Sequence, residues 1–177
     1  MATAEATADR PIFLCATPDA VLAGEGPEEI GYVLHLDGAD HWRVVGLTVR
    51  DGRKGVMVDG GVGNVLQGLT VTSIGDEGIH LRSDSTDNLV IDNVVSDTGI
   101  RRDKFGEGIY VGTAQSNWCE YTDCEPDRSD RNRGRILQRA LPLMVTATAG
   151  TPPPPRPPPV TTTEQPVAAV PPGPASM

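Results

Sequence analysis

The feature that most constrains this chain is an internal repeat with a period near 22 residues. LHLDGADHWRVVGLTV (residues 34–49) aligns with VMVDGGVGNVLQGLTV (56–71) at a constant offset of 22, and IHLRSDSTDNLVIDNVVS (79–96) continues the pattern. A further copy opens at IYVGTAQSNW (109–118), and residues 10–24 form a degenerate copy. This period is too short for paired helices, and the leucine spacing does not fit leucine-rich repeats.

Each repeat holds short runs of alternating apolar residues separated by polar turns. In residues 78–99, Ile79 and Leu81 alternate with polar neighbours, and Leu89 and Ile91 follow after a turn. This pattern predicts a parallel β-solenoid, in which alternate residues point inward and stack on their equivalents in the next coil, roughly 4.8 Å away. Small inward residues fill such an interior, in agreement with an aromatic content of 4%. We predict an all-β fold with four to five coils of roughly 22 to 30 residues each.

Proline content divides the chain. Of the 16 prolines, 11 lie in residues 151–177, a composition that favours extended polyproline geometry and cannot bury a core. We therefore predict a disordered start over residues 1–9, β-helix repeats over 10–132, an irregular or short helical segment over 133–150, and a disordered Pro-rich tail over 151–177.

Charge and hydropathy exclude several partners. The formal net charge of −9 argues against nucleic acid, because phosphate binding requires a basic surface. No apolar run approaches the roughly 20 residues that a membrane span needs. The first 14 residues have neither the basic nor the apolar region of a signal peptide. From this sequence alone we therefore expect a cytoplasmic location or leave the location open.

The stretches GLTV, GDEGIHLRSDSTDNLVIDNVVSDTG and FGEGIYVGTAQSNW resemble the right-handed parallel β-helix repeat proteins of the pectate-lyase-like superfamily, over residues 10–132. The resemblance implies a right-handed coil, a polysaccharide partner that includes uronate polymers, and secretion of full-length relatives. It is compatible with a lyase, which we favour over a hydrolase, or with a non-catalytic glycan-binding or structural solenoid, because fold does not set function.

Full-length members of that group have more coils than this chain. We interpret the abrupt change to a Pro-rich tail as a truncated or frame-shifted reading frame, with a linker or a wall-spanning stalk as the alternative. Open solenoid ends leave strand edges unpaired, and these edges favour self-association.

The repeat alignment brings three turns to one corner of the solenoid: residues 50–54, 73–77 and 97–107. The third turn is longer by about eight residues, and insertions on one edge of a solenoid often mark the binding face. The outward positions of the adjoining strands predict two ladders. The first consists of His35, Met57, His80 and Tyr110, and the second of Asp37, Asp59 and Arg82.

This corner supplies candidate residues for β-elimination on a uronate polymer, which needs a base for the C5 proton and a cation to neutralise the carboxylate. The resemblance implies a Lys or Arg base and often Ca²⁺. The candidate catalytic residues are His80, Arg82, Lys104, Asp76 and Glu107. The candidate substrate-binding residues are Tyr110, Trp118, Arg101 and Arg102. The candidate Ca²⁺ ligands are Asp76, Glu77 and Glu107.

Two alternatives compete with a lyase site. Hydrolysis needs two opposed carboxylates, for which Asp76 and Glu107 are the predicted pair. An ordinary solvated corner, built from Asp-Gly turns and surface ion pairs, would explain the same residues without catalysis. On that interpretation His35 lies on a solvated strand surface.

The cysteines and asparagines have structural interpretations. Cys119 and Cys124, in NWCEYTDCEPD, are close enough for a local disulfide of the kind found in secreted relatives, which leaves Cys15 unpaired. Three asparagines are predicted to be turn or ladder residues rather than ligands: Asn64, Asn88 and Asn93.

Overall fold

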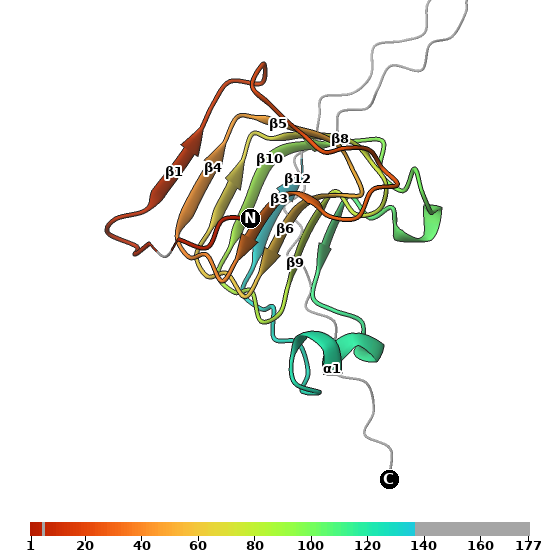
Figure 1. Ribbon diagram of the computed structural model, residues 1–177. Helices are drawn as coiled ribbons and strands as arrows, with labels where there is room; N and C mark the ends of the chain where they lie inside the picture. The colour runs from red at the N-terminus through yellow and green to blue at the C-terminus, as the bar shows by residue number, and fades with distance from the viewer. Residues whose placement is uncertain (5, 137–177) are drawn as a thin grey trace, which may run out of the picture.

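The computed structural model describes residues 1–4 and 6–136, and these residues form a parallel β-solenoid (Figure 1). The predicted fold class is therefore confirmed. One wall of the solenoid stacks β1 (Ile12–Cys15), β4 (Trp42–Val45), β7 (Val65–Gln67), β10 (Leu89–Val95) and β12 (Arg133–Ile136). The second wall stacks β2 (Val21–Ala23), β5 (Thr48–Gly52), β8 (Thr70–Ile74) and the end of β10, which joins these two walls into one sheet. The third wall is a separate four-stranded sheet of β3 (Tyr32–Asp37), β6 (Lys54–Asp59), β9 (Ile79–Arg82) and β11 (Ile109–Val111).

Three regular turns, β1–β3, β4–β6 and β7–β9, are followed by an enlarged fourth coil that contains β10 and β11. Equivalent asparagines are 24 residues apart across a regular coil and 44 apart across the enlarged one. The extra length holds all the helices in the described part of the chain: η1 (Asp103–Phe105), η2 (Gln115–Asn117) and α1 (Trp118–Tyr121). None of these is long or apolar enough to cross a membrane.

The solenoid extends beyond the predicted range of residues 10–132 at both ends. Residues 1–9 were expected to be disordered, yet Ala2 bridges Leu36 and donates its amide to the His35 carbonyl at 2.7 Å. At the other end β12 pairs in parallel with β10, although residues 133–150 were expected to be irregular or helical. The remainder of that segment and the Pro-rich tail over 151–177 lie outside the described residues.

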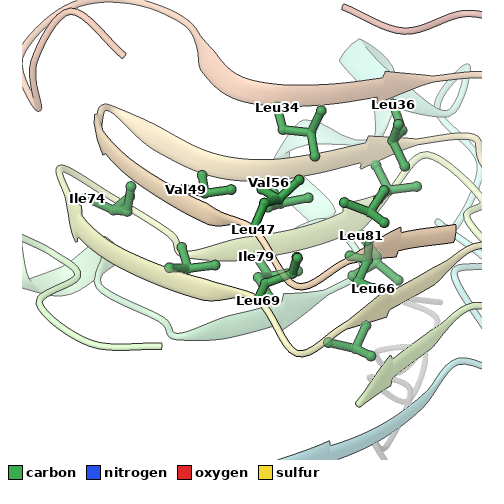
Figure 2. Close-up of a cluster of buried hydrophobic side chains, with 14 of the residues drawn as sticks. Leu34, Leu36, Leu47, Val49, Val56, Leu66, Leu69, Ile74, Ile79 and Leu81 are labelled. Atoms are coloured by element: carbon green, nitrogen blue, oxygen red, sulfur yellow. The ribbon is translucent and has the colours of Figure 1, made fainter. Parts of the chain in front are cut away.

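The interior is a stack of aliphatic side chains, with Leu, Val and Ile of one coil resting on those of the next (Figure 2). The largest fully buried side chains other than valine are Leu36, Met57, Leu66, Leu69, Ile74, Ile79 and Leu81. Met57 points outward, and the others point inward as the alternation predicted. Because the coil is narrow, no aromatic side chain is fully buried among the described residues.

Buried asparagines link successive coils at the corners. The side-chain oxygen of Asn64 accepts the Trp42 amide at 2.7 Å, that of Asn88 accepts the Asn64 amide at 2.8 Å, and that of Asn132 accepts the Asn88 amide at 2.9 Å. Asn93 accepts a backbone amide of the preceding coil in the same way at the next corner. The predicted ladder role of these asparagines is confirmed, and each ladder residue satisfies a backbone group that the turn leaves unpaired.

Replacing the buried Asn88 with Ala should destabilise the solenoid. The change removes the acceptor of the Asn64 amide and leaves the Gly61 carbonyl without its side-chain donor. The Gly61 carbonyl keeps the Thr86 amide, so the Asn64 amide is the group left without a partner. A buried group without a partner costs about 1–3 kcal/mol, so we expect urea titration to show a loss of about 1–3 kcal/mol in the free energy of unfolding. The matched control Asn117→Ala, at an exposed asparagine, should change it by less than about 0.5 kcal/mol. Equal values for the two variants would contradict the ladder.

Candidate functional site

The strand register confirms both predicted ladders on the four-stranded sheet. His35 pairs with Met57, Met57 with His80, and His80 with Tyr110. In the second ladder Asp37 pairs with Asp59, which pairs in turn with Arg82. These side chains alternate with the inward residues of Figure 2, so they occupy the outward face of this sheet.

The outward face is nevertheless largely buried. The exposed fractions of His35, His80 and Arg82 are 8%, 4% and 5%, and Met57 is fully buried. The expectation that His35 lies on a solvated strand surface is therefore wrong. The polar side chains pair with one another across the coils, and residues 112–128 of the enlarged coil pack against the end of β9.

Arg82 is the centre of one cluster on this face. Its Nε and Nη2 donate to the two carboxylate oxygens of Asp59 at 2.6 and 3.3 Å, and Nη2 also donates to the Tyr32 hydroxyl at 3.0 Å. The guanidinium carbon lies 3.9 Å from the centre of the Tyr121 ring. Nε2 of His35 lies 2.8 Å from Asp59 Oδ2. Burial alone would raise the pKa of Asp59, but the hydrogen bonds and charge of Arg82 outweigh it and hold this pKa below its usual value.

A second cluster joins His80, Glu77 and Lys54. His80 Nε2 lies 2.9 Å from the Gly112 carbonyl, which makes it the protonated ring nitrogen, and Nδ1 is left as a buried acceptor without a hydrogen-bond partner. Nδ1 faces Glu77 Oε1 at 3.9 Å, and the Lys54 ammonium lies 3.2 Å from Oε2 of the same carboxylate. Burial lowers the pKa of His80 to about 4, so the ring is neutral at pH 7. The Tyr110 ring packs on His80, with 4.4 Å between ring centres.

Asp76 fastens the long turn over residues 97–107 to the corner. Its two carboxylate oxygens accept from Arg101 at 3.0 and 2.6 Å, and its backbone carbonyl accepts the Gly99 amide. Arg101 has a raised pKa, chiefly because of the hydrogen bond to Asp76. Both residues are therefore engaged in holding the turn, which does not fit Asp76 as a hydrolytic acid or Arg101 as a free ligand-binding cation.

The predicted Ca²⁺ ligands do not form a metal site in the described part of the chain. Asp76 is paired with Arg101, Glu77 is paired with Lys54, and Glu107 is exposed. No group of three His, Cys, Asp or Glu residues within 1–4 and 6–136 has the arrangement of a metal site. We therefore assign no step to a metal ion.

The remaining candidates lie at the two projections of the enlarged coil, which leave opposite ends of β11 (Figure 1). On the first projection Lys104 and Arg102 are exposed, and the Lys104 ammonium lies 4.6 Å from the centre of the Phe105 ring. On the second, half-buried Trp118 donates its indole N–H to the Thr113 carbonyl at 3.0 Å. The single corner site expected from the sequence thus divides between the sheet face and two insertions.

Residues 112–128 form the second projection, which we call the flap. The predicted disulfide between Cys119 and Cys124 closes it, and Cys15 is free and exposed as expected. The Asp127 carboxylate accepts the backbone amides of Ser83 and Asp84 at 3.1 and 3.2 Å and so fixes the flap to the end of β9.

Sequence reasoning missed three residues of this face: Tyr32, Lys54 and Tyr121. Lys54 was placed at the corner but given no role, although its register with Tyr32 follows from the 22-residue offset. Tyr121 had no such signal, because the flap is outside the repeat; only its position between the paired cysteines marked it.

Comparison with known proteins supports the fold. No protein-family model and no curated protein matches the chain. Among solved structures, an alginate lyase from Paenibacillus sp. str. FPU-7 is similar, with a TM-score of 0.66 and 32% sequence identity over 75% of this chain. The match covers 43% of that lyase, so this chain spans less than half of its length. The similarity agrees with a parallel β-helix, while the resemblance to the repeat family has no support from a family model.

Arg82 and Lys104 should differ sharply in their contribution to stability. Arg82→Ala leaves the half-buried Asp59 carboxylate without its cation, and we expect it to lower the free energy of unfolding by about 2–4 kcal/mol. Lys104→Ala removes an exposed charge and should change it by less than about 0.5 kcal/mol. Urea unfolding at pH 7 compares the two variants, and equal losses would show that the outward face is not the paired, desolvated surface described above.

The stability of the protein should fall on acidification because of His80. The unfolded chain takes up a proton near pH 6.5, whereas folded His80 does so only near pH 4, so this contribution is complete above pH 6.5 and is lost toward pH 4. Between pH 7 and pH 5 the parent should lose about 1–2 kcal/mol more than His80→Gln, whose amide does not titrate. Urea titrations at the two pH values measure this difference, and identical losses would contradict a buried, neutral His80.

Proposed function

We propose that this chain acts on an extracellular polysaccharide through the outward face of the four-stranded sheet, and that the polymer is a uronate of the alginate class. The observation that carries the proposal is the 32% identity to an alginate lyase over 75% of this chain. The paired cations, imidazoles and tyrosine rings on one face of the solenoid support it, because a sugar acid offers a carboxylate, hydroxyls and an apolar ring face.

The proposed reaction is β-elimination. A base removes the C5 proton of a uronate, the C4–O4 bond breaks, a C4=C5 double bond forms, and an acid protonates the departing O4 oxygen. Of the three predicted bases, His80, Arg82 and Lys104, only Lys104 is exposed, so we assign it the proton abstraction. Tyr110 has a raised pKa, chiefly through burial and then through Glu107, and keeps the proton that O4 needs. His80 and Arg82 serve as positioning residues.

Elimination fits the face better than hydrolysis does. Hydrolysis requires two opposed carboxylates, and the predicted pair is Asp76 with Glu107. Asp76 is buried with both oxygens on Arg101, so it is not available to protonate or attack a glycosidic bond.

A non-catalytic glycan-binding solenoid is the alternative. One observation favours it: two cations of the face and one of the adjoining long turn are already matched by carboxylates, in the pairs Arg82–Asp59, Lys54–Glu77 and Arg101–Asp76. Either function implies export of the protein, and the Cys119–Cys124 disulfide fits an oxidising compartment.

Incubation of the full chain with alginate tests the proposal. Each elimination creates an unsaturated uronate end that absorbs in the ultraviolet, and we expect this absorbance to rise with the parent and to fall at least about 100-fold in rate with Lys104→Ala. Arg131→Ala, at an exposed ion pair on the end of the solenoid, is the matched control and should keep the parent rate. Binding without an unsaturated product would establish the alternative. If the chain neither binds alginate nor forms the product, a role in polyuronate metabolism is refuted.

A further inference from the structure

The tyrosines of this protein gather in one place. The chain has three tyrosines, and all three border the outward face of the four-stranded sheet: Tyr32 opens β3, Tyr110 lies in β11, and Tyr121 ends α1 in the flap. None belongs to the aliphatic core. A tyrosine ring combines an apolar face with a polar tip, and aromatic side chains outside a core are enriched where a ligand or partner is bound.

The two ends of the face differ in charge. At the flap end, Arg82 is neutralised by Asp59 through two hydrogen bonds, and its guanidinium contacts both the hydroxyl of Tyr32 and the ring of Tyr121. At the opposite end, Arg102 and Lys104 are exposed and have no carboxylate partner among the described side chains. An uncompensated cation attracts a carboxylate from a distance, whereas a compensated one does so only weakly.

We propose that the face recognises its glycan in two different ways. Tyr121 and Tyr32, which the buried Arg82–Asp59 pair holds in position, form a sugar subsite that contacts the ring and hydroxyls of one residue of the polymer. Arg102 contacts the carboxylate of another residue. This inference rests on the proposed function. It adds Tyr32 and Tyr121 as binding residues, and it assigns sugar-ring contacts to one projection and carboxylate contacts to the other.

The construction of the flap supports a fixed subsite. The disulfide joins the residues that flank Tyr121, Cys119 and Cys124, and Asp127 attaches the far end of the flap to the amides after β9. Tyr32 keeps 37% of its surface exposed and Tyr121 is only half-buried, so both rings remain accessible to a ligand. A ring held in this way loses little conformational freedom when it binds.

The two modes of recognition predict opposite responses to salt. Exposed charges are screened as ionic strength rises, and contacts with a sugar ring are not. In titrations of the full chain with alginate oligomers, Tyr121→Leu should raise Kd about tenfold over the parent, in both low and high salt. Arg102→Ala should raise Kd by a similar factor in low salt, and this factor should approach one in high salt.

Two controls keep the test independent of folding. Tyr121→Phe keeps the ring and should bind within about threefold of the parent, while Tyr121→Leu keeps apolar bulk without the ring. Their urea unfolding curves show whether either variant perturbs the flap. If the parent binds alginate and Tyr121→Leu binds equally well, or if its defect disappears in high salt, the subsite is wrong and the proposed function stands. If the parent does not bind, both are wrong.

Discussion

The hydrogen bonds between successive coils are the constraint on which the rest of this structure depends. Each strand pairs in parallel with its equivalent one coil away, and at the corners the asparagine side chains take over this pairing where strands end. A residue therefore lies beside residues 22 to 24 positions earlier and later. Side chains far apart in the sequence form continuous rows, and a few coils are enough to build an extended polar face.

The polar side chains of that face are stabilised by ion pairs with one another and not by contact with water. Taking Arg82, Asp59 and Glu77 out of water is costly, and the cost is offset because each has a partner on a neighbouring coil. The aliphatic interior leaves no room for aromatic rings, so the tyrosines lie outside it. The enlarged coil then brackets the face, with exposed cations on one projection and a disulfide-closed flap on the other. The exposed cations and the tyrosines of the face therefore lie toward different projections.

Much of this arrangement could be predicted from the sequence because a repeat encodes register directly. The constant offset placed His35, Met57 and His80 in one row, and the structure has them there. Burial of that row could not be predicted, since it depends on cross-coil ion pairs and on a flap outside the repeat. Tyr121 has no equivalent in another coil. Strand β12 was missed for the same reason, because 44 residues separate its coil from the last regular one.

The most direct test of the central claim, that this face binds a uronate polymer, is an NMR titration of the full chain with alginate oligomers. The ring resonances provide the probe and its control, because His80 and all three tyrosines border the face, whereas His41 lies at a different corner beside Gly63. The account predicts that the His80 and tyrosine signals shift together while those of His41 do not. Shifts at His41 alone, or none at any ring, would contradict it.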